Sequence, residues 1–382
     1  MHLIKKAADF AKRETVLTAA VLLAVISAFF VTPDSGYADY IDFRTLGLLF
    51  SLMTVTEGCK ELGLFDRFAR GILAKVHTAL GLSAVLVGLC FFSSMLITND
   101  VALLTFVPLS LITLSALGET GQSLLIPITV LQTIAANLGS MLTPIGNPQN
   151  LYLFGISDLT LTDFLGLMVP YTAVSAVMLI IWLLAVCKRA NSLTIPQNTI
   201  ADQKLKYSKK EKSRLFAYAL LFVLCLVTVA RLVPWQVTAL MALAYSAVFD
   251  RKALRSVDYS LLLTFCGFFV FIGNMGRTKF FASGLKNLIG GHELLVAAAA
   301  SQIISNVPCA ILLSGFTNKI DTLIIGTDIG GLGTLIASMA SLISYKKICR
   351  SHPEVKSRYL IYFTAANIVF LAAMAVTVFI VG

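Results

Sequence analysis

Charged residues are scarce in this sequence, making up 13% of its 382 residues, whereas hydrophobic residues make up 57%. A soluble domain has about 25% charged residues. No stretch is long and polar enough to form a separate soluble domain, and the apolar run 165–187 reaches the roughly 20 residues that cross about 30 Å of hydrocarbon. The sequence therefore excludes a soluble globular protein and predicts an all-α polytopic membrane protein.

Acidic residues are fewer than basic ones, 20 against 30, which gives a formal net charge of +10. A basic balance accompanies nucleic-acid binding in some proteins, but here the Lys and Arg residues gather in a few loops. Short cytoplasmic loops of membrane proteins are enriched in these residues. We therefore expect the lipid bilayer and a small solute as partners, and no nucleic acid.

The sequence also lacks a C-x-x-C pair and a histidine cluster. Its seven cysteines are scattered, mostly in apolar runs, and its four histidines fall in loops or at span ends. This pattern predicts no disulfide framework, no metal site and no cofactor. A membrane-embedded enzyme needs a nucleophile–base pair or a metal cluster, so we expect that the protein is not an enzyme.

Two pairs of polar breaks interrupt the apolar sequence. The first pair is Thr98-Asn99-Asp100 with the run 137–150, and the second is Ser305-Asn306 with the run 327–334. In hydrocarbon an unpaired backbone group costs several kcal/mol, so interrupted helices persist only around a protein-lined cavity. Interrupted segments at corresponding places in two halves mark the binding site of a secondary transporter.

The basic clusters predict a topology with a cytoplasmic N-terminus, beginning with the cluster Lys5 to Arg13, and a C-terminus outside. About nine full spans are expected, with two re-entrant hairpins and two broken helices. The predicted segments are a first span (1–38), a first repeat (39–187), a basic cytoplasmic linker (188–213), two connecting spans (214–252) and a second repeat (253–382). Span 43–58 runs inward and its partner 260–275 runs outward, so the repeats are predicted to be inverted.

The two halves align weakly but consistently. Asn99 aligns with Asn306, 207 positions later, and Asn137 aligns with Asp328, 191 positions later. The second offset also places Gly139 over Gly330 and Thr143 over Thr334. We take this as a sign of duplication.

Residues at the breaks are the candidate ligands for a solute or coupling ion. They are Thr98, Asn99, Asp100, Thr143, Asn147, Asn150, Ser305, Asn306 and Asp328. Several of them also suit helix capping, because their side-chain oxygens can accept from free N–H groups.

Two of these candidates are acidic, and several roles stay open for them. Asp100 carries a proton, binds a coupling cation, or only caps a helix; a carboxylate near the midplane is costly enough to suggest function. Asp328 is its counterpart in the other half, or lies nearer the outer surface. Four further charged residues at span ends are read as snorkelling anchors: Arg44, Glu57, Arg231 and Lys319.

From about residue 40 to its end, the chain resembles the ion transporter superfamily, through Thr98-Asn99-Asp100, the run 137–150 and Ser305-Asn306-Val307-Pro308. That superfamily includes arsenite permeases, NhaD-type sodium/proton antiporters, citrate transporters and divalent anion:sodium symporters. The resemblance implies that the hairpin tips and helix breaks hold the substrate and Na⁺. It also implies a homodimer in a bacterial cytoplasmic (inner) membrane.

The sequence departs from the superfamily pattern at two places. Residues 337–340 (Ala-Ser-Met-Ala) replace a Pro-Ile-Gly-Ser type run, and Asp100 and Val307 stand where sodium-coupled dicarboxylate members have Thr. These departures favour proton coupling through Asp100 and the arsenite/antiporter branch. We expect a secondary transporter for a small anion, an inorganic oxyanion or a carboxylate, coupled to H⁺ or Na⁺. The main alternative is a Na⁺/H⁺ antiporter of NhaD type; a passive channel or an embedded enzyme is less favoured.

Overall fold

The computed structural model describes residues 14–188 and 207–381, and this part of the chain is helical without a strand. The N-terminal basic cluster and most of the predicted linker lie outside these residues. The prediction of an all-α polytopic membrane protein is confirmed. Five described helices are long and apolar enough to cross a membrane alone, so the count of about nine spans stays a prediction.

The first half contains α2 (Thr15–Ala28), η1 (Ser35–Tyr40), α3 (Phe43–Glu61), α4 (Leu64–Leu73), α5 (Ala79–Ser94), α6 (Asn99–Ser115), α7 (Gly118–Ser140), α8 (Pro148–Ile156) and α9 (Leu161–Cys187). The second half contains α10 (Lys209–Val229), α11 (Trp235–Phe249), α12 (Arg251–Ser256), α13 (Tyr259–Arg277), α14 (Lys279–Ile289), α15 (Glu293–Ile304), α16 (Asn306–Ser314), α17 (Ile320–Ile329), α18 (Met339–Ser351), η3 (Pro353–Val355) and α19 (Lys356–Val381).

The four breaks in these helices fall at the polar segments of the sequence. Helices α6 and α16 begin at Asn99 and Asn306. Helix α8 begins at Pro148, which fits a first turn because proline has no N–H to leave unpaired. The second broken helix departs from the prediction, since α17 continues to Ile329 and Asp328 lies in its last turn. The interruption there covers residues 330–338.

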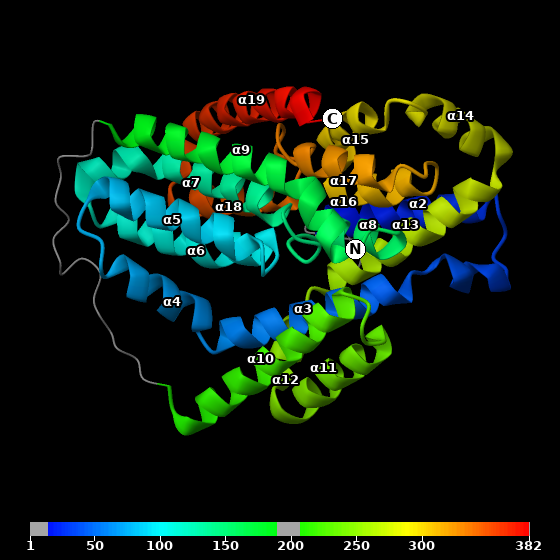
Figure 1. Cartoon of the computed structure of the whole chain (residues 1–382), viewed down its shortest axis with the longest axis horizontal. Coiled ribbons are helices and arrows are strands. Elements are labelled where there is room, and N and C mark those ends of the chain that lie inside the picture. Colours follow the sequence, from blue (N-terminus) through cyan, green and yellow to red (C-terminus); the bar gives the residue numbers. More distant parts are fainter. Residues whose placement is uncertain (1–13, 189–206, 382) are drawn as a thin grey trace, which may run out of the picture.

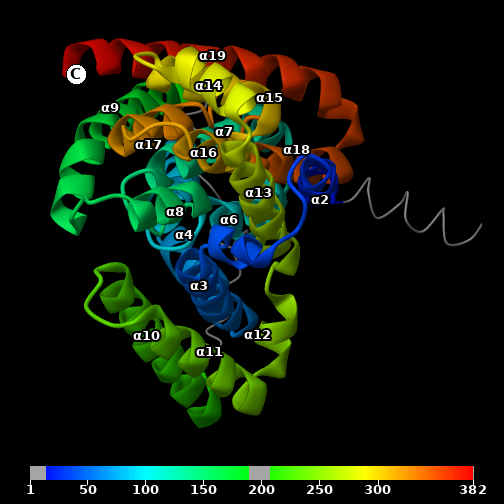
Figure 2. The ribbon, with the colours of Figure 1, turned by 90° about the vertical axis from the view of Figure 1, so that its right-hand side faces the viewer.

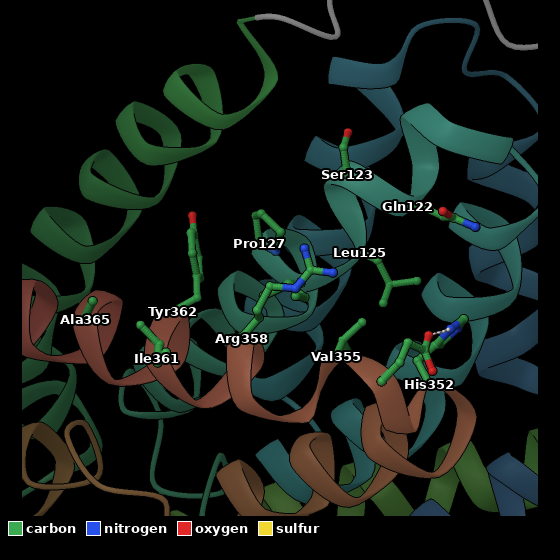
Figure 3. A pocket seen from close by; sticks show the side chains of 12 residues that line it. Gln122, Ser123, Leu125, Pro127, His352, Val355, Arg358, Ile361, Tyr362 and Ala365 are labelled. Carbon is green, nitrogen blue, oxygen red and sulfur yellow. Dashed lines mark hydrogen bonds and ion pairs between the residues drawn. The ribbon is translucent and has the colours of Figure 1, made fainter.

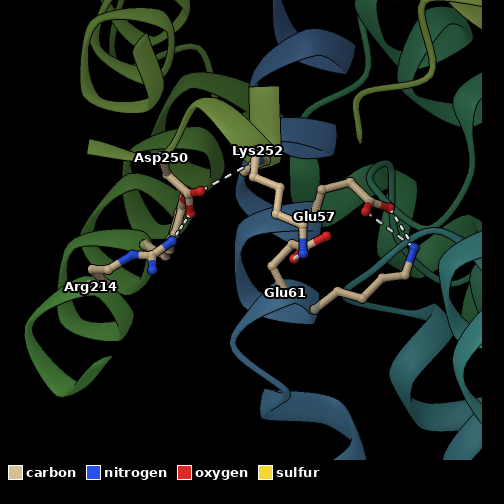
Figure 4. A network of polar contacts seen from close by, with 8 residues as sticks. Glu57, Glu61, Arg214, Asp250 and Lys252 are labelled. Atoms are coloured by element: carbon tan, nitrogen blue, oxygen red, sulfur yellow. Dashed lines mark hydrogen bonds and ion pairs between the residues drawn. The ribbon is translucent and has the colours of Figure 1, made fainter. Parts of the chain in front are cut away.

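Helices α3, α10, α11 and α12 form a lobe at the bottom of Figure 1, which we call the scaffold lobe. Ion pairs tie this lobe together at one end (Figure 4): Arg214 pairs with Asp250, and Lys252 with Glu61. The hairpins and broken helices (α5–α8 and α15–α18), with α9 and α19, lie above it and are called the hairpin module (Figures 1 and 2).

Within the hairpin module, each broken helix connects the two halves. Helix α7 packs on its own hairpin, α5 and α6, whereas α8 packs on α16 and α17 of the second half. In the same way α17 packs on α15 and α16, whereas α18 packs on α6 and α7. The second segment of each broken helix, α8 or α18, therefore packs against the other half of the chain. This arrangement brings all four breaks together.

Candidate functional site

Each hairpin tip is fixed by a backbone hydrogen bond to the break of the neighbouring helix. The amide of Asn99 donates to the carbonyl of Gly146 at 3.0 Å, and that of Asn306 donates to Ala337 at 3.0 Å. Both asparagine side chains cap their own helices, because the Oδ1 atoms accept from the next backbone N–H at 2.9 Å. The predicted capping by Thr98 and Ser305 is wrong, since neither side chain makes a capping hydrogen bond.

The two tips meet through Asn137. Its Oδ1 accepts from Asn99 Nδ2 at 3.1 Å and from Ser338 Oγ at 3.0 Å. Its Nδ2 donates to the carbonyl of Gly331 at 3.5 Å. A Cβ on Gly331 would lie 3.1 Å from Asn306 Nδ2, so the second tip reaches the same backbone. We call these five residues the tip network.

A second cluster, the carboxylate network, surrounds Asp328. One oxygen of its side chain accepts from Asn147 Nδ2 at 2.9 Å and from Gln149 Nε2 at 3.3 Å. The other accepts from Asn150 Nδ2 at 2.8 Å. Asp328 is 3% exposed, and all three donors come from the first turn or cap of α8, in the opposite half. This carboxylate therefore joins the two halves of the chain.

The charge on this carboxylate has no cationic partner. Among residues 14–188 and 207–381, no Lys or Arg forms an ion pair with Asp328, and its three hydrogen-bond donors are neutral amides. The neighbouring Oδ1 of Asn150 is buried and accepts no hydrogen bond from any described residue. A buried acceptor without a donor costs about 1–3 kcal/mol, which a bound cation or proton donor would relieve.

Helix ends complete the electrostatics of the site. Helices α6, α8, α16 and α18 begin here, and α7 and α17 end here. A helix N-terminus presents free N–H groups and partial positive charge, and a C-terminus presents free carbonyls and partial negative charge. The breaks therefore offer donors suited to an anion beside acceptors suited to a cation.

Matched contacts recur in the two halves at the offsets read from the sequence. Thr143 Oγ1 donates to the carbonyl of Met95 at 2.5 Å, and Thr334 Oγ1 donates to that of Gln302 at 3.0 Å. Gly139 and Gly330 also correspond. A Cβ on Gly139 would lie 2.7 Å from the Ser94 hydroxyl, and a Cβ on Gly330 would lie 2.8 Å from the Ser301 hydroxyl, so either would collide. Such matches are expected of a duplicated chain, and both the duplication and the inverted orientation of the halves stay predictions.

The structure separates the nine predicted site residues into groups. The tip network includes Asn99 and Asn306, the carboxylate network includes Asn147, Asn150 and Asp328, and Thr143 and Ser305 hold the connecting segments. Asp100 makes no side-chain hydrogen bond to either network, and its Oδ1 is buried without a described partner. Thr98 likewise joins neither network in the part of the chain that the structure describes.

Besides the Gly331 backbone, four side chains outside the predicted set contribute to the site. Gln149 belongs to the polar run 137–150, and Asn137 was aligned with Asp328, so both had a signal in the sequence. Ser338 lies in the segment that departs from the superfamily pattern. Gln302 had no signal; its Nε2 donates to the carbonyls of Gly330 at 2.9 Å and Leu332 at 2.8 Å, and so shapes the glycine-rich break.

Two arginines of the scaffold lobe and its loops hold the other end of α8. Arg44 Nη1 donates to the carbonyl of Gly155 at 2.8 Å. Arg231 Nη2 donates to those of Phe154 at 2.9 Å and Ser157 at 2.5 Å. Both arginines thus bind the free carbonyls at a helix C-terminus, and their role as snorkelling anchors stays a prediction. The other two anchors form ion pairs instead, Glu57 with Lys60 at 2.9 Å and Lys319 with Glu293 at 3.5 Å.

A cavity of about 570 Å³ separates the scaffold lobe from the first hairpin. It is lined mainly by apolar side chains of α3, α4 and α10, including Val55, Phe65 and Phe222. Leu96 and Ile97 line it from the hairpin, two or three residues before the tip at Asn99. The described structure thus has open space beside the first hairpin tip.

Comparisons with known proteins agree with this architecture. The sequence profile of the citrate transporter family (CitMHS) matches residues 4–322. The chain is 32% identical to the inner membrane protein YbiR of Escherichia coli over 331 residues, covering 85% of this chain and 86% of that protein. It is also 32% identical to an uncharacterized transporter of Methanocaldococcus jannaschii over 311 residues, covering 80% and 81%. A transporter of Mycobacterium tuberculosis, also uncharacterized, is 26% identical over 375 residues, covering 87% and 85%.

Proposed function

Because the chain belongs to the citrate transporter family and is an integral membrane transporter, we propose that it is a secondary active transporter for a small anion. The solute is an inorganic oxyanion or a carboxylate, with citrate as the first to test. H⁺ or Na⁺ drives its movement. Two inverted repeats alternate access to the site between the two sides, and the protein assembles as a homodimer.

The observation that carries this proposal is the meeting of four helix N-termini and two amide networks at one place. N–H groups and amide donors bind oxyanions without needing a positive residue, as helix N-termini do in other proteins. The site can therefore take up an anion and release it again. Asn99 and Asn306, one at each hairpin tip, are the residues that we assign to solute binding.

The coupling ion is assigned to Asp328. This carboxylate is buried without a cationic partner, and the Asn150 oxygen beside it has no donor among the described residues. Binding H⁺ or Na⁺ there neutralises a charge that would otherwise repel an anionic solute. Asp100 was the coupling residue favoured by the sequence; the hydrogen bonds shift that assignment to Asp328, because Asp100 makes none with either network.

Oxygen acceptors in the same site favour one second candidate function, that of a Na⁺/H⁺ antiporter. The Asp328 carboxylate, the Asn150 oxygen and the carbonyls at the ends of α7 and α17 are all oxygen ligands. Hard cations bind such ligands, and Na⁺ needs no further anion in the site.

Proteoliposome flux separates the two functions. We expect citrate or a related anion to accumulate against its gradient when an inward H⁺ or Na⁺ gradient is imposed, and not when that gradient is collapsed by an ionophore. Na⁺-dependent proton flux without any added anion would favour the antiporter. Dissipation without uphill accumulation would contradict both and indicate a channel.

A further inference from the structure

A second concave site lies away from both networks, where α7 and α19 begin. This pocket of about 590 Å³ is shown in Figure 3. Its lining comes from residues 122–127 of α7 and from residues 352–365, which cover η3 and the first turns of α19. Nothing in the transport cycle proposed above uses it.

The lining is polar at one end and apolar at the other. Arg358 extends into the pocket toward Leu125 and Pro127 (Figure 3). Its guanidinium has no ion pair with any residue in the described ranges 14–188 and 207–381. Ile361 and Ala365 continue the wall along the same face of α19, one and two turns further into the helix.

Glu354 is the acidic residue of this lining, and it is already paired. Its Oε1 lies 3.3 Å from Nδ1 of His352, whose Nε2 lies 3.3 Å from Ser115 Oγ. The positive charge of Arg358 therefore remains available to an anion in the pocket.

The pocket lies at the start of a long apolar helix, where lipid phosphates are expected. Arg358 is in the first turn of α19, at the end of a long apolar helix, where basic residues meet headgroups. Trp182 Nε1 donates to the hydroxyl of Tyr362 at 2.9 Å, and such amphipathic aromatic side chains lie at the membrane–water interface. One turn above Arg358, Ile361 is 72% exposed, as expected of a side chain that faces acyl chains.

From these contacts we propose that the pocket binds an anionic phospholipid. The headgroup phosphate accepts hydrogen bonds from the Arg358 guanidinium, and an acyl chain lies along Ile361 and Ala365. Arginine suits this role because its planar guanidinium donates two parallel hydrogen bonds to phosphate oxygens. The formal net charge of +10 adds a general attraction to anionic lipids, and Arg358 is the Lys or Arg residue that lines this pocket.

Native mass spectrometry of the purified full-length protein tests the proposal. Phosphatidylglycerol and phosphatidylcholine are titrated in turn, and the dissociation constant of the first bound lipid is compared among variants. We expect Arg358→Gln to weaken phosphatidylglycerol binding roughly fivefold and to leave phosphatidylcholine unchanged. Arg350→Gln, which removes an exposed charge of α18 outside the pocket, should match the wild type.

A second variant and a competition experiment complete the test. Ala365→Trp fills the apolar end without changing charge and should weaken both lipids, which covers the case that Arg358→Gln fails to fold. An excess of glycerol 3-phosphate should not displace the bound lipid. Equal binding by the Arg358→Gln and Arg350→Gln variants, an unchanged Ala365→Trp variant, or displacement by glycerol 3-phosphate would each overturn the proposal.

Discussion

At the residue scale, Asp328 stands out because its hydrogen-bond donors all come from the opposite half of the chain. Asn147, Gln149 and Asn150 each direct an amide at its carboxylate. One side chain thus connects the halves and provides the charge that we assign to the coupling ion. These two roles are separable by substitution.

Asp328→Ala removes the acceptor for three buried amides, whereas Asp328→Asn retains an acceptor oxygen and the shape. An unpaired buried donor costs about 1–3 kcal/mol, so the alanine variant should lose several degrees of thermal stability and the asparagine variant fewer. If Asp328 carries the coupling ion, the asparagine variant should fold and yet lose gradient-driven uptake. Asp321→Asn, on the exposed start of the same helix, is the control. Wild-type uptake by Asp328→Asn would contradict the coupling role.

Asp250 gives a prediction about pH. Burial acts to raise its pKa, but hydrogen bonds from Tyr218 and Arg214 outweigh burial and hold the pKa below the usual value of 3.8. A carboxyl group with a lowered pKa stabilises the fold above its unfolded-state pKa, and this contribution is lost as the pH falls through the folded-state pKa.

Asp250→Asn should therefore lower the melting temperature at neutral pH, and its difference from the wild type should shrink below about pH 4. Melting curves of the detergent-purified protein across this range check the prediction. A difference that does not change with pH would show that the charge of Asp250 is not responsible.

Several residues of the two networks could be picked out from the sequence, because polar side chains inside apolar runs are costly. It favoured Asp100 over Asp328, since both are acidic residues beside a break and only tertiary packing decides which one meets the amides of α8. Gln302 could not be found, because a glutamine in a hairpin helix has no local signature. Its role depends on the carbonyls of a break about 30 residues away.

At the scale of elements, α8 is held at both ends. Its first turn binds Asp328, and its last carbonyls bind Arg44 and Arg231. Cations at a helix C-terminus also interact favourably with its partial negative charge. This short helix therefore has a fixed position between the scaffold lobe and the second half.

Arg231→Gln should release the end of α8 and lower thermal stability, because hydrogen bonds from charged groups contribute about 1.5–3 kcal/mol. The loss should be larger in the double variant with Arg44→Gln. Arg251→Gln is a matched control, since Arg251 is exposed and donates to a carbonyl of the preceding helix, Ala247. The melting temperatures of the purified variants test this prediction. Equal stability of the Arg231→Gln and Arg251→Gln proteins would refute the role of Arg231.

Helix boundaries followed the hydropathy of the sequence closely where apolar runs end at polar residues. The predicted boundary was wrong at the second broken helix, because helix α17 continues past the polar residues Thr327 and Asp328 to Ile329. The backbone leaves the helix after Ile329, and within the break Gly333 adopts φ +109°. Helix α12 was also not predicted; it is a short helix that itself contains the basic residues Arg251, Lys252 and Arg255.

At the scale of the whole molecule, two sequence offsets describe the contacts of both halves. The first hairpin and the second hairpin are related by 207 positions, and the broken helices by 191. The matched contacts could be predicted from this spacing. The packing of α8 and α18 against the other half could not, because it joins residues more than 170 positions apart, as in the contact between Asn147 and Asp328.

We propose above all that the two hairpins enter the membrane from opposite sides and that their tips border one site. Leu96 and Ile303 test it, since they correspond by the hairpin offset, precede the tips by three residues and are 54% and 76% exposed. Each is replaced by Cys in a background without the seven native cysteines, and sided vesicles are treated with a membrane-impermeant maleimide. We predict labelling of Leu96→Cys from one side and of Ile303→Cys from the other, and labelling of both from the same side would contradict opposite entry of the hairpins.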